Sequence, residues 1–245
     1  MSVRQLGLPF LHEASYRDVD FVPAPSNAEA LAWLAQPWPA GRLALWGDAG
    51  TGKTHLLHGW ACRVGAAVLY GPELRSWQAE ARARVAPWAL AVDDADLAAD
   101  EAVLLHLLNA ASEAGRPVLL TGREPPARWP AALPDLASRL RATAAVGLRP
   151  ADDELLRVLL ARVLSERQLA VPGSVQDWLL LHLPRTAACV REVAARVDRL
   201  ALAHGGPVTR ALAAAALAGI VDDEVSVSEG AVAPPDLSPR EPLLL

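Results

Sequence analysis

The residues from Gly47 to Thr54 match the phosphate-binding pattern G-x-x-x-x-G-K-[ST] at all four fixed positions. The full segment is Gly47, Asp48, Ala49, Gly50, Thr51, Gly52, Lys53 and Thr54. Its glycines allow backbone N–H groups to turn toward an anion, and the following helix directs its positive end to the same place. Lys53 is the only lysine among 23 lysines and arginines. We expect it to contact β- and γ-phosphates, with the Thr54 hydroxyl as a ligand of Mg²⁺.

Two adjacent acids, Asp93 and Asp94, follow an apolar segment at 88–92. In P-loop proteins, an acid at the end of such a strand holds Mg²⁺ directly or through water, which is the role predicted for Asp93. Asp94 is predicted to polarise an attacking water molecule. The alternative is that both acids cap the following helix together with Asp96.

Two arginines occupy positions from which they could act on a phosphoryl group. Arg139 lies in the segment 133–140, just before the last predicted strand, and Arg191 lies early in a later helix. An arginine that reaches a transferring phosphoryl group accelerates the reaction by about 10³–10⁵. The alternative is that both are surface arginines of an arginine-rich chain.

The residue types of the N-terminal segment at 5–10 are typical of a short docking peptide. It consists of Gln5, Leu6, Gly7, Leu8, Pro9 and Phe10. Leu8 and Phe10 would anchor it in an apolar groove, and Gln5 would orient it by hydrogen bonding. The alternative is a strand that packs on its own domain.

The composition of the chain excludes several classes of protein. The chain has 245 residues, of which 52% are hydrophobic, so it can form one large or two modest domains. A formal net charge of −5 argues against tight intrinsic binding to DNA. We find no apolar run long enough to span a membrane and no secretory signal. Two cysteines, Cys62 and Cys189, are too few for a disulfide framework and indicate a reducing cytoplasm.

Strand and helix patterns alternate up to about residue 149 and become purely helical afterwards. Strands are predicted at 42–46, 66–70, 88–92, 117–121 and 144–148, and helices at 27–35, 53–64, 73–84, 100–114 and 135–141. Ser26 is the expected cap of the first helix. Such alternation predicts a parallel sheet with helices on both faces. Four further helices are expected at 153–168, 174–183, 187–204 and 208–221, with Asp152 capping the first, and a disordered tail from about 225.

Several of these segments, taken in order, resemble the DnaA family of AAA+ ATPases. The segment at 43–57, including His55, is similar to the family's P-loop, and the segment at 21–27, with Val22 and Asn27, to its adenine-side segment. Residues 120–126, 133–140 and 190–192 are similar to its sensor 1, arginine-finger and sensor 2 segments. The resemblance covers about residues 5–220.

The resemblance implies an α/β fold of the AAA+ P-loop NTPase type: a five-stranded parallel sheet plus an all-helical lid domain, with ATP or ADP and Mg²⁺ between them. The implied division is an N-terminal segment at 1–25, a nucleotide-binding domain at 26–149, a lid at 150–222 and a tail at 223–245. Arg139 would act in trans on a neighbouring subunit's nucleotide, and Arg191 in cis from the lid. Arg123 departs from the family, which usually has aspartate at sensor 1, so turnover of the chain's own ATP is expected to be weak.

Within that family, the chain resembles the regulatory inactivators of DnaA, the Hda-like proteins. Residues 5–10 are similar to the motif that docks replication proteins on the DNA polymerase III β sliding clamp, and the initiator's DNA-reading domain is not found after the lid. The implied partners are the clamp and DnaA, with DNA contacted only through them, and the implied location is the cytoplasm, at the replisome. Two alternatives stay open: a nucleotide-switched adaptor without a catalytic contribution, and a helicase-loader-type ATPase.

Overall fold

The structure, a computed structural model, describes residues 22–75 and 88–229. Its contacts divide the chain into two compact units. The first extends to Leu159 and includes Arg185–Ala187, and the second holds Leu160–Pro184 and the residues from Ala188 onward. The division falls inside the helix Asp153–Glu166 that follows the sheet. The domain boundary at 149 stays a prediction. The segment at 5–10 and most of the helix predicted at 73–84 lie outside the described residues.

The first unit is built on a five-stranded parallel sheet with the strand order β2-β3-β4-β1-β5. The strands are β1 Arg42–Trp46, β2 Ala67–Tyr70, β3 Leu90–Asp93, β4 Val118–Gly122 and β5 Ala144–Gly147. Both β3 and β4 are buried along their whole length, as expected for apolar strands covered on two faces. The parallel sheet predicted from the sequence is confirmed.

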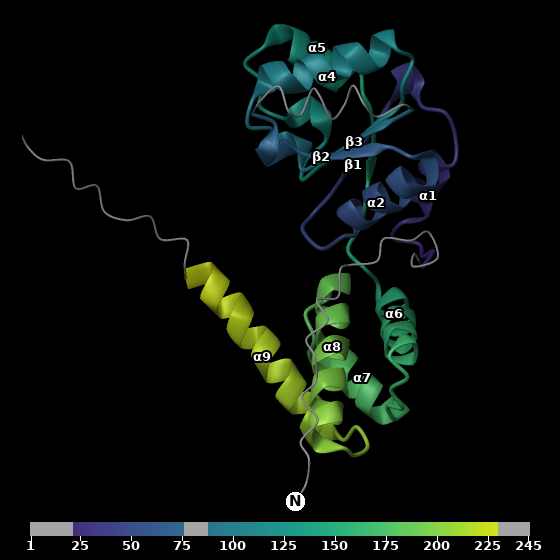
Figure 1. Cartoon of the computed structure of the whole chain (residues 1–245), viewed down its shortest axis with the longest axis vertical. Helices are drawn as coiled ribbons and strands as arrows, with labels where there is room; N and C mark the ends of the chain where they lie inside the picture. Colours follow the sequence, from purple (N-terminus) through teal and green to yellow (C-terminus); the bar gives the residue numbers. More distant parts are fainter. Residues whose placement is uncertain (1–21, 76–87, 230–245) are drawn as a thin grey trace, which may run out of the picture. The chain divides into compact units, whose positions relative to one another are not determined.

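Helices cover both faces of this sheet (Figure 1). The α-helices are α1 Ala28–Leu34, α2 Lys53–Val64, α4 Glu101–Glu113 and α5 Pro134–Arg141, and the 3-10 turns are η2 Pro39–Gly41, η3 Gly71–Glu73, η4 Ala95–Leu97 and η5 Pro126–Arg128. Asp100 caps α4 by accepting the N–H groups of Ala102 and Val103. The predicted cap of α1 was wrong: Asn27, not Ser26, is its N-cap residue.

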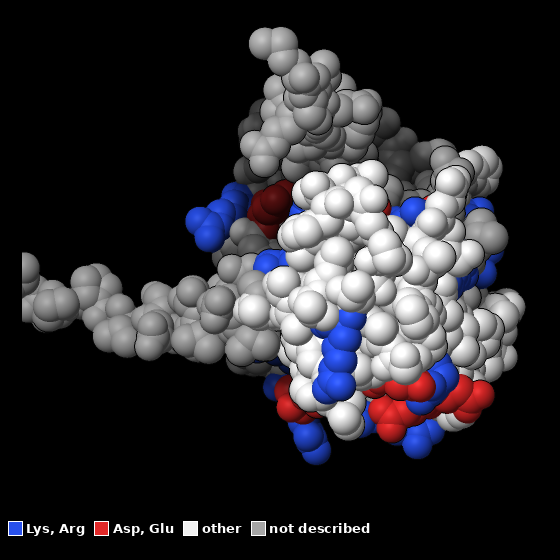
Figure 2. Space-filling view, turned by 90° about the horizontal axis from the view of Figure 1, so that it is seen from below, with Lys and Arg blue, Asp and Glu red and all other residues white. Residues whose placement is uncertain are grey.

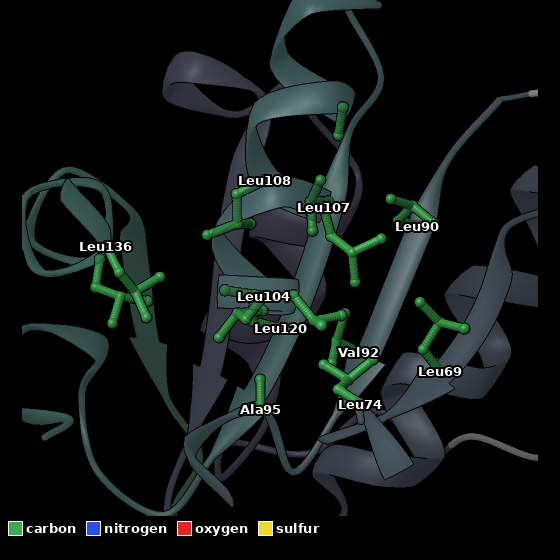
Figure 3. Packing of buried hydrophobic residues seen from close by; sticks show 14 of the residues in the cluster. Leu69, Leu74, Leu90, Val92, Ala95, Leu104, Leu107, Leu108, Leu120 and Leu136 are labelled. Atoms are coloured by element: carbon green, nitrogen blue, oxygen red, sulfur yellow. The ribbon is translucent and has the colours of Figure 1, made fainter. Parts of the chain in front are cut away.

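Alternation along β1 distributes the core between the two faces. Leu43 and Leu45 pack with the helices α1 and α2, whereas Ala44 packs with α4 and α5. On the latter face, leucines of α4 point onto β3 and β4, and Leu136 of α5 extends the same cluster (Figure 3). The two clusters hold the strands in fixed register, and this register determines which side chains meet at the ends of the strands.

After β5 the chain is helical, with α6 Asp153–Glu166, α7 Gly173–His182, α8 Ala187–His204 and α9 Arg210–Glu229. Asp152 accepts the N–H of Leu155 at 2.8 Å, which confirms its predicted capping role. α9 continues to Glu229, so residues 223–229 are helical and do not belong to the tail that the sequence suggested. No helix in the described part of the chain has the length and apolar character needed to cross a bilayer.

A substitution at Leu120 tests the packing of helices against the centre of the sheet, because Leu120 lies in the middle of β4 and is 0% exposed. We expect Leu120→Ala to lower the free energy of unfolding by about 2–5 kcal/mol, the usual effect of a cavity at a fully buried leucine. Urea unfolding followed by tryptophan fluorescence measures the change. Leu97→Ala is the matched control, since Leu97 is 52% exposed and its truncation should change stability by less than about 0.5 kcal/mol. Equal effects of the two substitutions would contradict the packing described.

Candidate nucleotide-binding site

The carboxyl ends of three neighbouring strands carry the candidate site. β4 lies between β1 and β3 in the sheet, and all three strands run in the same direction. The P-loop follows β1, Asp93 ends β3, and Thr121 is the last residue but one of β4. The fold therefore brings to one edge the residues that the sequence placed far apart.

The P-loop closes around the ammonium group of Lys53. Its Nζ donates to the carbonyl oxygens of Gly47 at 2.7 Å and Asp48 at 2.8 Å, and the side chain is buried. Gly52 precedes α2 with a φ of 97°, a left-handed conformation that favours glycine. Burial lowers the pKa of Lys53 below its ordinary value, and the charges of Asp94, Asp93 and Asp96 oppose this shift. A cation held against carbonyl groups beside these acids is suited to neutralising phosphate oxygens.

The P-loop backbone keeps donors available for an anion. Among the hydrogen bonds of the described residues, the N–H groups of Gly50 and Gly52 donate to no acceptor, while that of Thr51 donates to Asp48. The first N–H groups of α2 have no acceptor inside the helix either. Asp48, Ala49 and Gly50 are exposed, so an anion can reach this segment from solvent. The residues present therefore fit the phosphates of a nucleotide.

The carboxylate of Asp93 joins the ends of β3 and β4 to the first turn of α2. Its Oδ1 accepts the hydroxyl of Thr121 at 2.6 Å and that of Thr54 at 3.2 Å, and the residue is 4% exposed. The two residues predicted to hold Mg²⁺, Thr54 and Asp93, are thus in direct contact. Mg²⁺ is usually bound through one or two protein oxygens, with water and phosphate completing its shell, and this pair can supply those oxygens.

Asp94 adopts a left-handed conformation with a φ of 49°. Its N–H donates to the Thr121 hydroxyl at 2.8 Å, and its carbonyl lies so close to Gly71 that a Cβ at position 71 would collide with it. Burial, followed by the charges of Asp93 and Asp96, raises the pKa of the Asp94 carboxyl, while Lys53 and Arg123 lower it. A carboxyl that is reluctant to ionise among other acids fits the predicted role beside a water molecule.

Arg123 begins the loop after β4 and is exposed. Its N–H donates to Asp96 Oδ2 at 2.7 Å, whereas Asp96 Oδ1 is buried without a hydrogen-bond partner. The positive charge of Arg123 lowers the pKa of both Lys53 and Asp94, so Arg123 lies near the same end of the site. The position where the resemblance suggested an acid thus places a second cation near Lys53 and Asp94.

Sequence reasoning assigned no role to Thr121, which links Asp93 to Asp94. The sequence feature that could have indicated its role is a single hydroxyl side chain near the carboxyl end of an otherwise apolar strand, Val118–Gly122. A polar side chain that is 0% exposed must find hydrogen-bond partners, and at a strand end these are the acids of the neighbouring strand.

The segment with Val22 and Asn27 is linked to the P-loop through the chain after β5. Asn27 is buried, and its Nδ2 donates to the carbonyl of Val22 at 3.0 Å. Arg149 donates to the carbonyls of Ser26 and Pro25, and the preceding Leu148 donates to that of Trp46, just before the P-loop. The predicted adenine-side residues therefore lie close to the start of the P-loop.

Arg139 lies at the opposite edge of the sheet. It is near the carboxyl end of α5, and the chain then enters β5 at its amino end, where Ala144 pairs with Leu43. The Arg139 carbonyl accepts the Thr143 hydroxyl at 2.9 Å, which fixes this turn. The P-loop leaves the carboxyl end of β1, so the body of the sheet separates Arg139 from the phosphate-binding segment of its own chain.

Two further groups of predicted site residues belong to other parts of the chain. Arg191 is exposed at the start of α8, beside the buried Val190, in the second unit. The two units are described separately, so its action on the nucleotide stays a prediction. Gln5, Leu6, Leu8, Pro9 and Phe10 lie outside the described residues.

The fold of the chain is similar to the folds of several solved structures. Domain III of the replication initiation protein DnaA from Thermotoga maritima gives a TM-score of 0.70 at 20% identity, over 84% of this chain and 97% of that one. The fold is that of the AAA+ P-loop NTPases. For AMPPCP-bound DnaA from Aquifex aeolicus, the TM-score is 0.61 and the sequence identity 18%. The match covers 80% of this chain and 68% of that one. For the RuvB Holliday junction branch migration motor of T. maritima, the TM-score is 0.62 and the sequence identity 18%. This match covers 78% of this chain and 68% of that one. No protein-family profile matches the sequence.

The raised pKa of Asp94 predicts a pH-dependent effect of Asp94→Asn. The folded protein binds the Asp94 proton more tightly than the unfolded chain, so ionisation above the ordinary pKa of 3.8 reduces stability. Asparagine removes that charge and tolerates the left-handed conformation. We expect Asp94→Asn to raise the melting temperature at pH 7, with the difference from wild type vanishing as the pH falls below about 3.8. Thermal unfolding without added Mg²⁺ measures this, and a difference independent of pH would contradict it.

Proposed function

We propose that this protein binds ATP or ADP with Mg²⁺ at the P-loop and uses it mainly as a structural ligand. The Lys53 cradle, the available N–H groups of Gly50 and Gly52, and the Thr54–Asp93 pair support the proposal. Thr54 and Asp93 would hold Mg²⁺, which neutralises phosphate charge when bound. Val22 and Asn27 would lie on the adenine side. AMPPCP-bound DnaA offers a precedent for a nucleotide on a similar fold.

The protein's main activity, in this proposal, is exerted in trans on ATP bound to DnaA. The observation that carries this step is the position of Arg139, at the sheet edge opposite its own P-loop. An arginine so placed is remote from its own P-loop and would be available to the nucleotide of a neighbouring subunit. The likeness to DnaA domain III makes a mixed contact between the two proteins geometrically reasonable, because similar domains can stack as copies of one domain do.

Arg139 would act by stabilising charge. When it reaches the γ-phosphate of DnaA-bound ATP, its guanidinium stabilises the negative charge that spreads over the transferring phosphoryl oxygens. DnaA is then left with ADP, and the protein acts as a negative regulator of replication initiation. Water activation would be left to groups of DnaA, so this chain needs no turnover of its own.

Residues 5–10 would tether the protein to the β sliding clamp, with Leu8 and Phe10 as apolar anchors. The proposal rests on the sequence, since these residues lie outside the described part of the structure. A tether raises the effective concentration of a weakly binding partner without adding contacts. Activity would therefore depend on clamps present on replicating DNA.

Direct contact with DNA is not required. The face shown in Figure 2 is mostly uncharged, and the coloured basic side chains of the described residues alternate with acidic ones and with uncharged surface. A tight nonspecific DNA-binding surface would instead show a continuous basic stripe. The clamp and DnaA would supply the link to DNA.

Arg123 supports a second candidate, a nucleotide-switched adaptor with no catalytic contribution. Its positive charge lowers the pKa of Lys53 and Asp94, and a guanidinium cannot accept a hydrogen bond from water as a carboxylate does. An adaptor would bind nucleotide and clamp while leaving DnaA-bound ATP intact. Following the ATP on DnaA therefore separates the two candidates.

Arg139→Ala tests the proposal most simply. We expect stimulation of DnaA-bound ATP hydrolysis to fall by about 10³-fold or more, to the unstimulated rate, because the transition-state charge loses its partner. Affinity of the protein for its own nucleotide should stay unchanged, since Arg139 is remote from the P-loop. Conversion of labelled ATP on DnaA, with clamp-loaded DNA present, measures the rate. Arg141→Ala, an exposed neighbour on the same helix, is the control. Full stimulation by Arg139→Ala would refute the assignment.

Gln5→Ala combined with Phe10→Ala tests the tether. We expect clamp binding to be lost in a surface-immobilised titration, because the peptide loses an apolar anchor and its orienting amide. Nucleotide affinity should be unaffected. A double variant that binds the clamp as tightly as wild type would show that this segment is not the docking element.

A further inference from the structure

Arg42, the first residue of β1, is a buried cation for which the nucleotide site has no use. It is 6% exposed, and its Nε is buried without a hydrogen-bond partner. No carboxylate of the described residues forms an ion pair with it in the structure. An arginine with a buried, unsatisfied nitrogen reduces stability unless another group compensates it, so its presence calls for an explanation.

Arg139 lies at the same edge of the sheet as Arg42. Side chains alternate along β1, so Arg42 lies on the same face as Ala44, which packs in one cluster with Leu136 and Leu140 of α5. The turn after α5 leads to Ala144, whose partner in the sheet is Leu43. Arg42 and the last turn of α5, with Arg139, thus share the amino edge of the sheet.

The two charges interact. Burial, followed by the positive charge of Arg139, lowers the pKa of Arg42 below its ordinary value, although a guanidinium remains protonated at neutral pH. The negative end of the α5 dipole offsets part of the repulsion at this point. Arg42 is buried, whereas Arg139 is only partly buried, so Arg139 is the side chain with more room to move away.

We propose that Arg42 is a positioning residue for Arg139. Its buried guanidinium repels the Arg139 side chain, keeps it from folding back onto the sheet edge and directs it outward, where it can meet an anionic phosphate of a neighbouring subunit. The inference rests on the proposed action in trans. It also gives a reason for a buried cation that apolar packing could replace.

Arg42→Met and Arg42→Lys form the test, because methionine keeps most of the volume without the charge and lysine keeps the charge. We expect Arg42→Met to reduce the maximal stimulation of DnaA-bound ATP hydrolysis by about tenfold, which corresponds to about 1.4 kcal/mol of coupling between two neighbouring charges, with the half-saturating concentration unchanged. Arg42→Lys should restore most of the stimulation. The melting temperature of Arg42→Met should equal or exceed that of wild type, because removing an unpaired buried cation does not destabilise the fold.

A second measurement does not involve DnaA. Phenylglyoxal modifies accessible guanidinium groups, and mass spectrometry of the digested protein gives the rate at Arg139, with Arg141 as the internal reference. We expect slower modification of Arg139 in Arg42→Met than in wild type or Arg42→Lys, because Arg139 can then fold back.

The outcomes separate the two proposals. An unchanged Arg139 modification rate in Arg42→Met overturns the positioning role, and so does a lower melting temperature with no recovery in Arg42→Lys, which would assign Arg42 to stability alone. If wild-type protein leaves DnaA-bound ATP intact while the modification rate responds as expected, the positioning stands and the proposed function fails.

Discussion

The carboxylate of Asp93 is the group on which the site depends. It accepts the hydroxyls of Thr121 and Thr54, and so connects the ends of β3 and β4 to the first turn of α2. Such charge-assisted hydrogen bonds in a buried place are stronger than those at a surface and fix side-chain orientation. Through Thr121 the same network holds the backbone of Asp94 in its left-handed conformation. The acids therefore face the P-loop because β3, β4 and β1 are neighbours in a parallel sheet.

The two edges of the parallel sheet carry side chains suited to different roles. Its carboxyl edge gathers Lys53, Thr54 and Asp93, which suit phosphate and Mg²⁺, while its amino edge carries Arg42 and Arg139. Each chain would thus hold a nucleotide at one edge and offer a cation at the other. A protein built in this way can influence its neighbour's nucleotide without hydrolysing its own, which agrees with a cation, Arg123, at the end of β4.

Local patterns made much of this structure predictable. The P-loop signature located Lys53 and the start of α2 to the residue, and apolar runs located the strands, because a buried parallel strand must be apolar on both faces. Thr121 and Arg42 could not be assigned, since their roles come from residues that are distant in sequence and meet only through strand order and register. The end of α9 was missed because its acidic last residues resemble a solvated tail, although they also continue a helix.

The claim that the chain acts on another protein's nucleotide can be tested by labelling the two nucleotides differently. DnaA is loaded with ATP carrying one radioisotope and this protein with ATP carrying another, and both are followed after mixing with clamp-loaded DNA. The account predicts that the label on DnaA becomes ADP rapidly while the label on this protein changes slowly. Rapid hydrolysis of this protein's own ATP, with the label on DnaA unchanged, would contradict it.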